Sequence, residues 1–149
     1  MSSNERMSER LALVGTIDPD AYGTGAQTMD VIDMQHYRRV LFTVLAGTLG
    51  TSGTIDFAIY GDSGSNGSFA TLITGKEVTQ ITDAGTHSDK QRQIEVTAEE
   101  VAAQGLRYLR ASMTVGTATS DACAIAQAEG LRYRPASAYD LASVDEIIT

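Results

Sequence analysis

The densest apolar run of the chain covers residues 38–47. Two arginines are followed by six apolar residues and one threonine, and Gly47 ends the run. A run this short, rich in Val, Leu and Phe and bounded by turn residues, is typical of a strand. Its nearly continuous apolar character predicts a central strand buried on both faces. We expect the rest of the chain to be organised around this strand.

The remaining sequence alternates short apolar runs with glycines, serines and threonines. With 149 residues, 14 glycines and 2 prolines, it is typical of one all-β domain with many turns. About eight strands with turns every eight to twelve residues indicate an antiparallel two-sheet β-sandwich. Both a jelly-roll-like and an immunoglobulin-like sandwich fit this spacing, and the spacing alone does not choose between them. The candidate strands are 11–17, 28–34, 38–46, 54–60, 69–73, 77–81, 91–96, 106–115 and 122–128.

One short segment has helical rather than strand signals. Thr97 is followed three residues later by Glu100, which is the spacing of a capping box. We therefore expect one short helical turn near 98–103, ended by Gly105.

The chain divides into three predicted parts. Residues 1–25 form an N-terminal arm and a first strand, which we expect to stop at 18–20, where Asp-Pro-Asp interrupts the apolar pattern. This first strand can pair within its own sheet or reach a neighbouring subunit. Residues 26–134 form the β-sandwich domain, and residues 135–149 form an acidic C-terminal tail.

The charge balance excludes two classes of partner. The chain carries 11 basic and 19 acidic residues, a formal net charge of −8. Nucleic-acid binders need clustered cations, and anionic membrane surfaces also attract basic segments. The N-terminus lacks the apolar core of a signal peptide. We therefore expect a protein made in the cytoplasm that contacts neither nucleic acid nor membrane.

No constellation in the sequence predicts catalysis, a metal or a cofactor. The motif at 61–65 resembles the nucleophile loop of trypsin-like proteases, but His36 and Asp56 precede it at spacings far too short for that triad. Neither His36 nor His87 has a second ligand at zinc spacing. The single cysteine, Cys123, lies in an alternating apolar run and predicts a buried structural thiol. We expect a non-enzyme without cofactors.

The C-terminal tail has apolar residues although it follows the last predicted strand. Such a tail can pack on its own domain or dock onto a neighbour. The N-terminal arm has the same two possibilities. From both chain ends we predict a set of residues that form an interface with another copy of the chain or with a larger assembly: Leu11, Val14, Tyr22, Tyr133, Tyr139, Leu141, Ile147 and Ile148.

From Asp30 to its end, the sequence resembles small proteins that tailed bacteriophages and prophages encode near their capsid genes. The similarity rests on structural motifs at 31–34, 37–42, 53–57, 105–111, 115–119, 134–137 and 139–141. It implies a virion component, and specifically a capsid decoration (cement) protein on the exterior of the head. Such proteins are commonly β-sandwiches or jelly rolls that form trimers and clamp adjacent capsomers.

The resemblance therefore predicts a jelly-roll-like sandwich that forms a homotrimer. It also predicts the major capsid protein as the partner, so that the interface residues named above contact either another copy or the capsid. Two alternatives remain open at this stage. The first is a carbohydrate-binding module on the virion surface, which would need exposed aromatics to stack on sugars; Tyr22, Tyr60, Tyr133 and Tyr139 are the candidates. The second is a head–tail or tail connector, a ring-forming structural protein.

Overall fold

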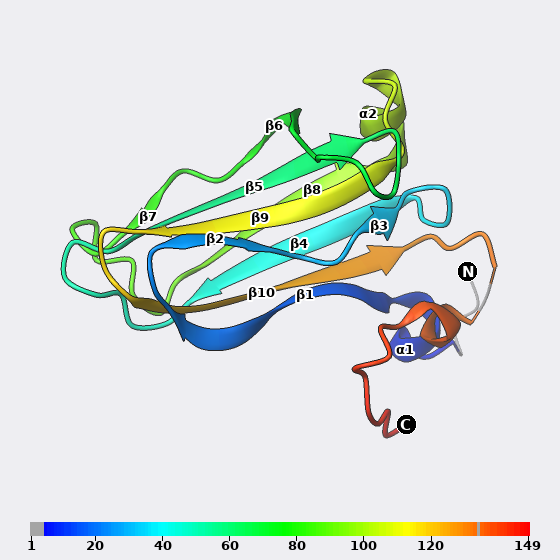
Figure 1. Cartoon of the computed structure of the whole chain (residues 1–149). Coiled ribbons are helices and arrows are strands. Elements are labelled where there is room, and N and C mark those ends of the chain that lie inside the picture. Colours follow the sequence, from blue (N-terminus) through cyan, green and yellow to red (C-terminus); the bar gives the residue numbers. More distant parts are fainter. Residues whose placement is uncertain (1–4, 134) are drawn as a thin grey trace.

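Two antiparallel sheets pack face to face in the computed structural model, which describes residues 5–133 and 135–149 (Figure 1). The predicted arm begins in residues 1–4 and the predicted domain boundary falls on Arg134, and these residues lie outside the described part. The first sheet has the order β1 (Ala12–Tyr22), β10 (Ser120–Glu129), β4 (Arg39–Ala46) and β8 (Gln91–Thr97). The second has the order β2 (Gly25–Thr28), β9 (Tyr108–Gly116), β5 (Thr54–Asp62) and β6 (Thr71–Glu77), with the two-residue strands β3 (Ile32–Asp33) and β7 (Ile81–Thr82) paired to β9 and β5.

The strand order is that of a jelly roll. The eight longer strands, numbered one to eight along the chain, give sheets of order 1-8-3-6 and 2-7-4-5, so strands distant in sequence become neighbours. The predicted all-β sandwich is confirmed. Within the described residues three short helices accompany it: α1 (Met7–Arg10), α2 (Ala98–Ala103) and the 3-10 turn η1 (Ala136–Tyr139). Helix α2 has the predicted capping box, with Thr97 and Glu100 bonded reciprocally.

Strand β4 is central in the first sheet, as predicted, but it is buried on one face only. Val40, Phe42 and Val44 are fully buried, whereas Leu41 and Leu45 are half-buried on the outer face. The second sheet covers the inner face alone, so the apolar run supplies one buried row and one partly exposed row. The prediction of two buried faces was wrong for this reason.

The core lies between the two sheets. The inner row of β4 belongs to the same buried cluster as residues from β5 and β9, among them Phe57, Ile59, Leu109 and Met113. Full burial of such a side chain stabilises the fold by about 1.5–3 kcal/mol. This buried core holds the two sheets together, and the sandwich positions the segments at its ends.

Strand β1 continues past the point where we expected it to stop. It runs to Tyr22 through Pro19, and its register against β10 shifts between Ile17 and Asp20. A proline is tolerated here because β1 is an edge strand with a bulge at this position. The strand pairs within the chain's own sheet.

Two other strand predictions were wrong in detail. The segment 28–34 is not one strand: β2 and β3 each pair with β9, and Met29 to Val31 separate them. The segment 69–81 was expected as strands at 69–73 and 77–81. Strand β6 instead runs through Gly75, which has a positive φ of 73°, and the register of its pairing with β5 shifts beside it. A bulge thus replaces the expected turn.

Cys123 is not a buried core thiol. Strand β10 points Ala122 and Ala124 inward, and Cys123 lies half-buried on the outer face. Burial raises the pKa of its thiol.

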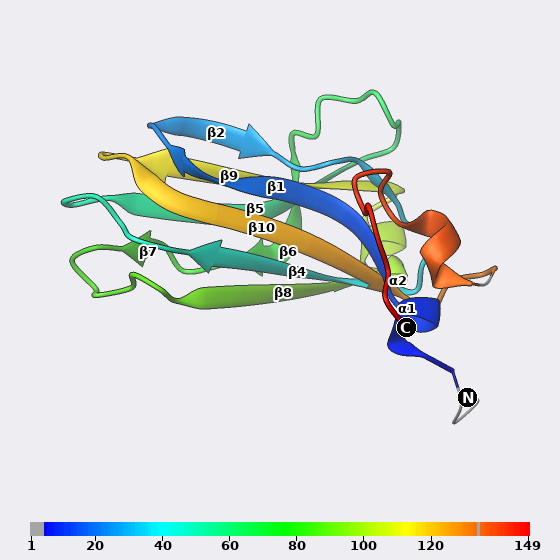
Figure 2. The ribbon, with the colours of Figure 1, turned by 90° about the horizontal axis from the view of Figure 1, so that it is seen from below.

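Helix α1 and the turn η1 lie side by side at one end of the sandwich (Figure 2). Among the described residues, no helix has the length and apolar character needed to cross a membrane.

Candidate functional site

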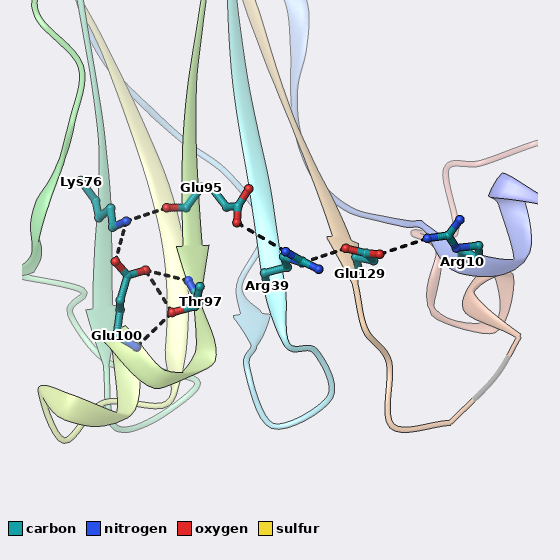
Figure 3. Close-up of polar contacts among 7 residues, drawn as sticks. All are labelled: Arg10, Arg39, Lys76, Glu95, Thr97, Glu100 and Glu129. Carbon is teal, nitrogen blue, oxygen red and sulfur yellow. Dashed lines mark hydrogen bonds and ion pairs between the residues drawn. The ribbon is translucent and has the colours of Figure 1, made fainter. Parts of the chain in front are cut away.

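We call the end of the sandwich where β10 leaves the sheet and β4 begins the terminal end, because α1, η1 and the tail lie there. A row of ion pairs crosses it (Figure 3). Arg10 of α1 lies 3.3 Å from Glu129 of β10, and Glu129 lies 2.8 Å from Arg39 of β4. Arg39 lies 4.0 Å from Glu95 of β8. The row joins helix α1 to three neighbouring strands.

A second set of contacts joins β8 to helix α2 and to strand β6 of the other sheet. Lys76 of β6 lies 2.8 Å from the Glu100 carboxylate and donates to the Glu95 carbonyl at 2.7 Å (Figure 3). Glu100 also accepts from the backbone N–H of Thr97 at 2.8 Å. The hydrogen bond from Lys76, followed by that from Thr97, lowers the pKa of the Glu100 carboxyl. Helix α2 is thereby fixed to both sheets.

A groove of about 770 Å³ opens at the terminal end beside this network. It lies between the turn leading into β4, the start of α2 and the segment after β10. Its lining combines apolar side chains with three arginines and one carboxylate: Met34, Gln35, Tyr37, Arg38, Arg39, Thr97, Ala98, Glu99, Gly130, Leu131 and Arg132.

The position of Arg38 in this lining depends on the backbone conformation of Gly130. Gly130 has a positive φ of 70°, and the aliphatic stem of Arg38 lies against it, so that a Cβ at position 130 would be only 2.7 Å from Cβ, Cγ and Cδ of Arg38. Glycine is thus required both for its conformation and for the close approach. The chain turns sharply out of β10 here and forms one wall of the groove.

Three aromatic rings attach η1 to the turn before β4. Tyr139 lies 6.1 Å from Tyr37 in an edge-to-face arrangement and 5.7 Å from His36, measured between ring centroids. Burial, and secondarily the neighbouring Tyr139, raises the pKa of Tyr37 to about 12. An ion pair also fixes the residue that precedes this turn: Arg107 Nη2 lies 2.6 Å from the Asp33 carboxylate.

The first part of the tail is hydrogen-bonded to β1. The Leu13 N–H donates to Asp140 Oδ1 at 2.6 Å, and the Leu141 N–H donates to the Leu13 carbonyl at 2.9 Å. Beyond Val144 the side chains are exposed, with Ile147 at 44% and Ile148 at 86%. The tail is therefore anchored at its start and presented to solvent at its end.

The structure brings some of the predicted interface residues together and separates others. At the terminal end, Leu11 and Leu141 are half-buried, Tyr139 packs in the aromatic cluster, and Tyr133, Ile147 and Ile148 are exposed. Val14 is instead a core residue with 6% exposure.

Tyr22 lies at the opposite end of β1, where its hydroxyl donates to the Asp18 carbonyl at 2.5 Å. Desolvation, and secondarily Asp20 and Asp18, raises its pKa.

Exposed large hydrophobic side chains come mainly from the segments at the chain ends. Met7 is 70% exposed and Tyr133 is 67% exposed, and the two tail isoleucines belong to the same group. Val31, with 39% exposure, comes from the link between β2 and β3. Soluble proteins commonly expose single apolar residues, and these are the exposed apolar side chains that a partner can contact.

Sequence reasoning missed the groove residues Arg38 and Arg132 and the ion-pair hub Glu129. Arg38 entered the sequence analysis through the apolar run and the motif at 37–42, and not as a groove residue. It lies far from Glu129 and Arg132 in the sequence and becomes their neighbour only because β10 pairs with β4 in the jelly roll. Sequence spacing therefore contains little indication that they share a site. The one local cue was Gly130 directly after the last strand.

The described residues contain no cluster of three or more His, Cys, Asp or Glu side chains that could hold a metal. His87 stabilises the turn that contains it, because its Nδ1 accepts a hydrogen bond from the Thr82 N–H at 3.0 Å. The loop that resembles a protease motif is a backbone turn organised by Asp62, which accepts from the N–H groups of Gly64 at 3.0 Å and Phe69 at 3.2 Å.

No protein-family model matches the sequence, and no curated protein matches it. Among solved structures, the VP2 subviral particle of infectious bursal disease virus is similar, with 15% identity and a TM-score of 0.49 over 87% of this chain and 35% of that chain. The K3 adhesin domain of Lys-gingipain from Porphyromonas gingivalis gives 17% identity and a TM-score of 0.42 over 72% of this chain and 66% of that chain. A pilus protein of Bacillus endospore appendages gives 10% identity and a TM-score of 0.36 over 87% and 98%. The chain spans about a third of the length of the viral capsid proteins that it resembles.

Proposed function

We propose that this chain is a structural, non-catalytic virion protein. In this proposal it binds the exterior of a tailed-phage head as a homotrimer and stabilises the head by bridging major capsid subunits. The observation that carries the proposal is the terminal end itself. There the sandwich presents ion pairs, a mixed groove and exposed apolar side chains from both chain ends.

Two further considerations support this assignment. The sequence from Asp30 onward resembles phage proteins encoded beside capsid genes. The strand order is a jelly roll, an architecture used by viral capsid and lectin domains, although a fold by itself identifies no function.

The proposed division of labour modifies the three predicted parts of the chain. The sandwich, to which β1 (Ala12–Tyr22) belongs, is the scaffold, while the residues before β1 and the tail 135–149 supply the contacts. Each copy needs to bury only a modest apolar area, because many linked copies act together on one shell.

Quantitative mass spectrometry of purified particles tests the proposal. A decoration protein should be present at a copy number comparable with that of the major capsid subunit, and protease should reach it on intact heads. Particles lacking the gene should lose heat resistance and regain it when the purified protein is added. A copy number matching a single ring would assign the protein to a connector instead, and absence from particles would refute a virion role.

A further inference from the structure

Two arginine side chains of the groove have no partner among the described residues. Arg39 is paired with Glu129, but neither Arg38 nor Arg132 makes a side-chain hydrogen bond or ion pair there. The only carboxylate in the lining is Glu99. In a chain with a net charge of −8, the groove is thus a local site of positive charge beside apolar side chains.

The end of the tail has the complementary composition. Residues 142–149 contain the adjacent carboxylates Asp145 and Glu146, followed directly by Ile147 and Ile148. In the described structure these carboxylates make no hydrogen bond or ion pair, and both isoleucines are exposed. The tail therefore carries two unpaired anions beside two uncovered apolar side chains.

We propose that the groove binds the C-terminal tail of a second copy of this chain. The carboxylates of Asp145 and Glu146 pair with the guanidinium groups of Arg38 and Arg132, and the isoleucines cover the apolar part of the lining. Arginine is suited to this role because its planar fork binds carboxylates through two parallel hydrogen bonds. The inference rests on the self-association in the proposed function and names the surfaces that mediate it.

The size of the groove agrees with this occupant. The groove volume of about 770 Å³ lies within the range of ligand pockets, roughly 300–1,000 Å³, so it fits a short peptide segment. The tail is hydrogen-bonded to its own β1 at Leu141. The eight residues 142–149 beyond this anchor can span at most about 29 Å when extended, which limits how far away the receiving groove can lie.

The symmetry of such a contact agrees with a trimer. The tail and the groove are different surfaces, so a copy can give its tail to one neighbour and receive a tail from another, whereas two copies that exchange tails form a two-fold dimer. A head-to-tail contact of this kind closes into a ring when the rotation between copies permits it.

Charge reversal in the full-length protein tests the pairing. We expect the wild-type chain to sediment as an oligomer that dissociates on dilution. Both the groove variant R38E/R132E and the tail variant D145K/E146K should raise the dissociation constant by at least about tenfold, which corresponds to about 1.4 kcal/mol. The variant that combines all four changes restores opposite charges between groove and tail and should regain most of the association.

A matched control changes the same charge elsewhere. The variant K90E/R92E alters the net charge as much as the groove variant but lies outside the groove, and it should keep the wild-type dissociation constant. Thermal unfolding of each variant identifies any that fails to fold. A wild-type monomer at all concentrations, or association that the combined variant does not restore, would overturn the inference. Capture of the tail by its own groove would also overturn it. Particle copy number tests the virion role separately.

Discussion

Arg39 and Glu129 lie opposite each other in the register of β4 and β10, with Nε of the arginine 2.8 Å from the glutamate carboxylate. The same carboxylate lies 3.3 Å from Arg10 of helix α1. Glu129 therefore connects the N-terminal helix to the central strand of the sheet. Because these side chains are partly exposed, each pair contributes modestly to stability.

Substitution of Glu129 by Gln should lower the free energy of unfolding by about 1 kcal/mol, since it removes the charge that faces two arginines. Urea unfolding at neutral pH measures this change. The control is Glu95→Gln, which removes a single, more distant pair at 4.0 Å and should cost less. A larger loss for the Glu95 variant would contradict the assignment of Glu129 as the hub.

The Thr97 side chain should contribute measurably to the stability of the whole domain. Its hydroxyl accepts from the Glu100 N–H at 3.3 Å, and the helix that it caps buries Val101 with 1% exposure. Thr97→Ala should cost about 1 kcal/mol in urea unfolding, the usual effect of removing an N-cap side chain. Thr97→Ser retains the hydroxyl and should stay close to wild type; an equal loss in both variants would indicate lost packing instead.

Local patterns in the sequence were sufficient to predict the long strands and the cap. Residues 54–60 and 106–115 alternate cleanly, and β5 and β9 follow them closely. The errors occur where tertiary pairing overrides the local pattern. Pro19 is tolerated only because β1 is a bulged edge strand, and the segment 28–34 divides because β9 pairs with it twice.

The candidate site was predictable only in part. The tail and Tyr139 could be selected because apolar residues after the last strand are conspicuous. Val14 could not be distinguished from an interface residue, since a half-buried edge strand and a core strand share the same alternation. The groove arginines meet through long-range topology, which neither composition nor spacing reveals.

Acid should destabilise the protein in part through Asp33. The hydrogen bond from Arg107 is the main cause that lowers the pKa of this carboxyl from 3.8. A carboxyl with a lowered folded pKa stabilises the fold above its unfolded pKa of about 4, and this contribution is lost as pH falls through the folded value. Asp33→Asn should therefore be less stable at pH 7 and lose less stability on acidification.

Urea unfolding between about pH 5 and about pH 2 measures this difference. Arg107→Gln removes the main cause that lowers the pKa of Asp33. Like Asp33→Asn, it should therefore reduce the loss of unfolding free energy on acidification. Retention of the full acid dependence in the Arg107 variant would contradict the role of this ion pair.

Gly67 should be intolerant of any side chain. A Cβ at this position would overlap the Asp62 carboxylate, which holds the loop through hydrogen bonds from the Gly64 and Phe69 N–H groups. Gly67→Ala should therefore lower the free energy of unfolding by about 1–3 kcal/mol. Gly64→Ala in the same loop is the control, because its nearest contact would be at 3.9 Å, and it should have a small effect. Equal effects would show a general need for glycine in this loop.

The Asp140 carboxylate should control how firmly the tail is held on β1. It accepts the Leu13 N–H at 2.6 Å, and the next residue, Leu141, donates back to the Leu13 carbonyl at 2.9 Å. Asp140→Ala removes the first bond and weakens the second, so the Leu13 amide should exchange its hydrogen at least about tenfold faster. Hydrogen–deuterium exchange on peptides from β1 measures this rate. Asp140→Asn keeps an acceptor oxygen and should retain most of the protection, whereas unchanged exchange in the Ala variant would show that η1 alone anchors the tail.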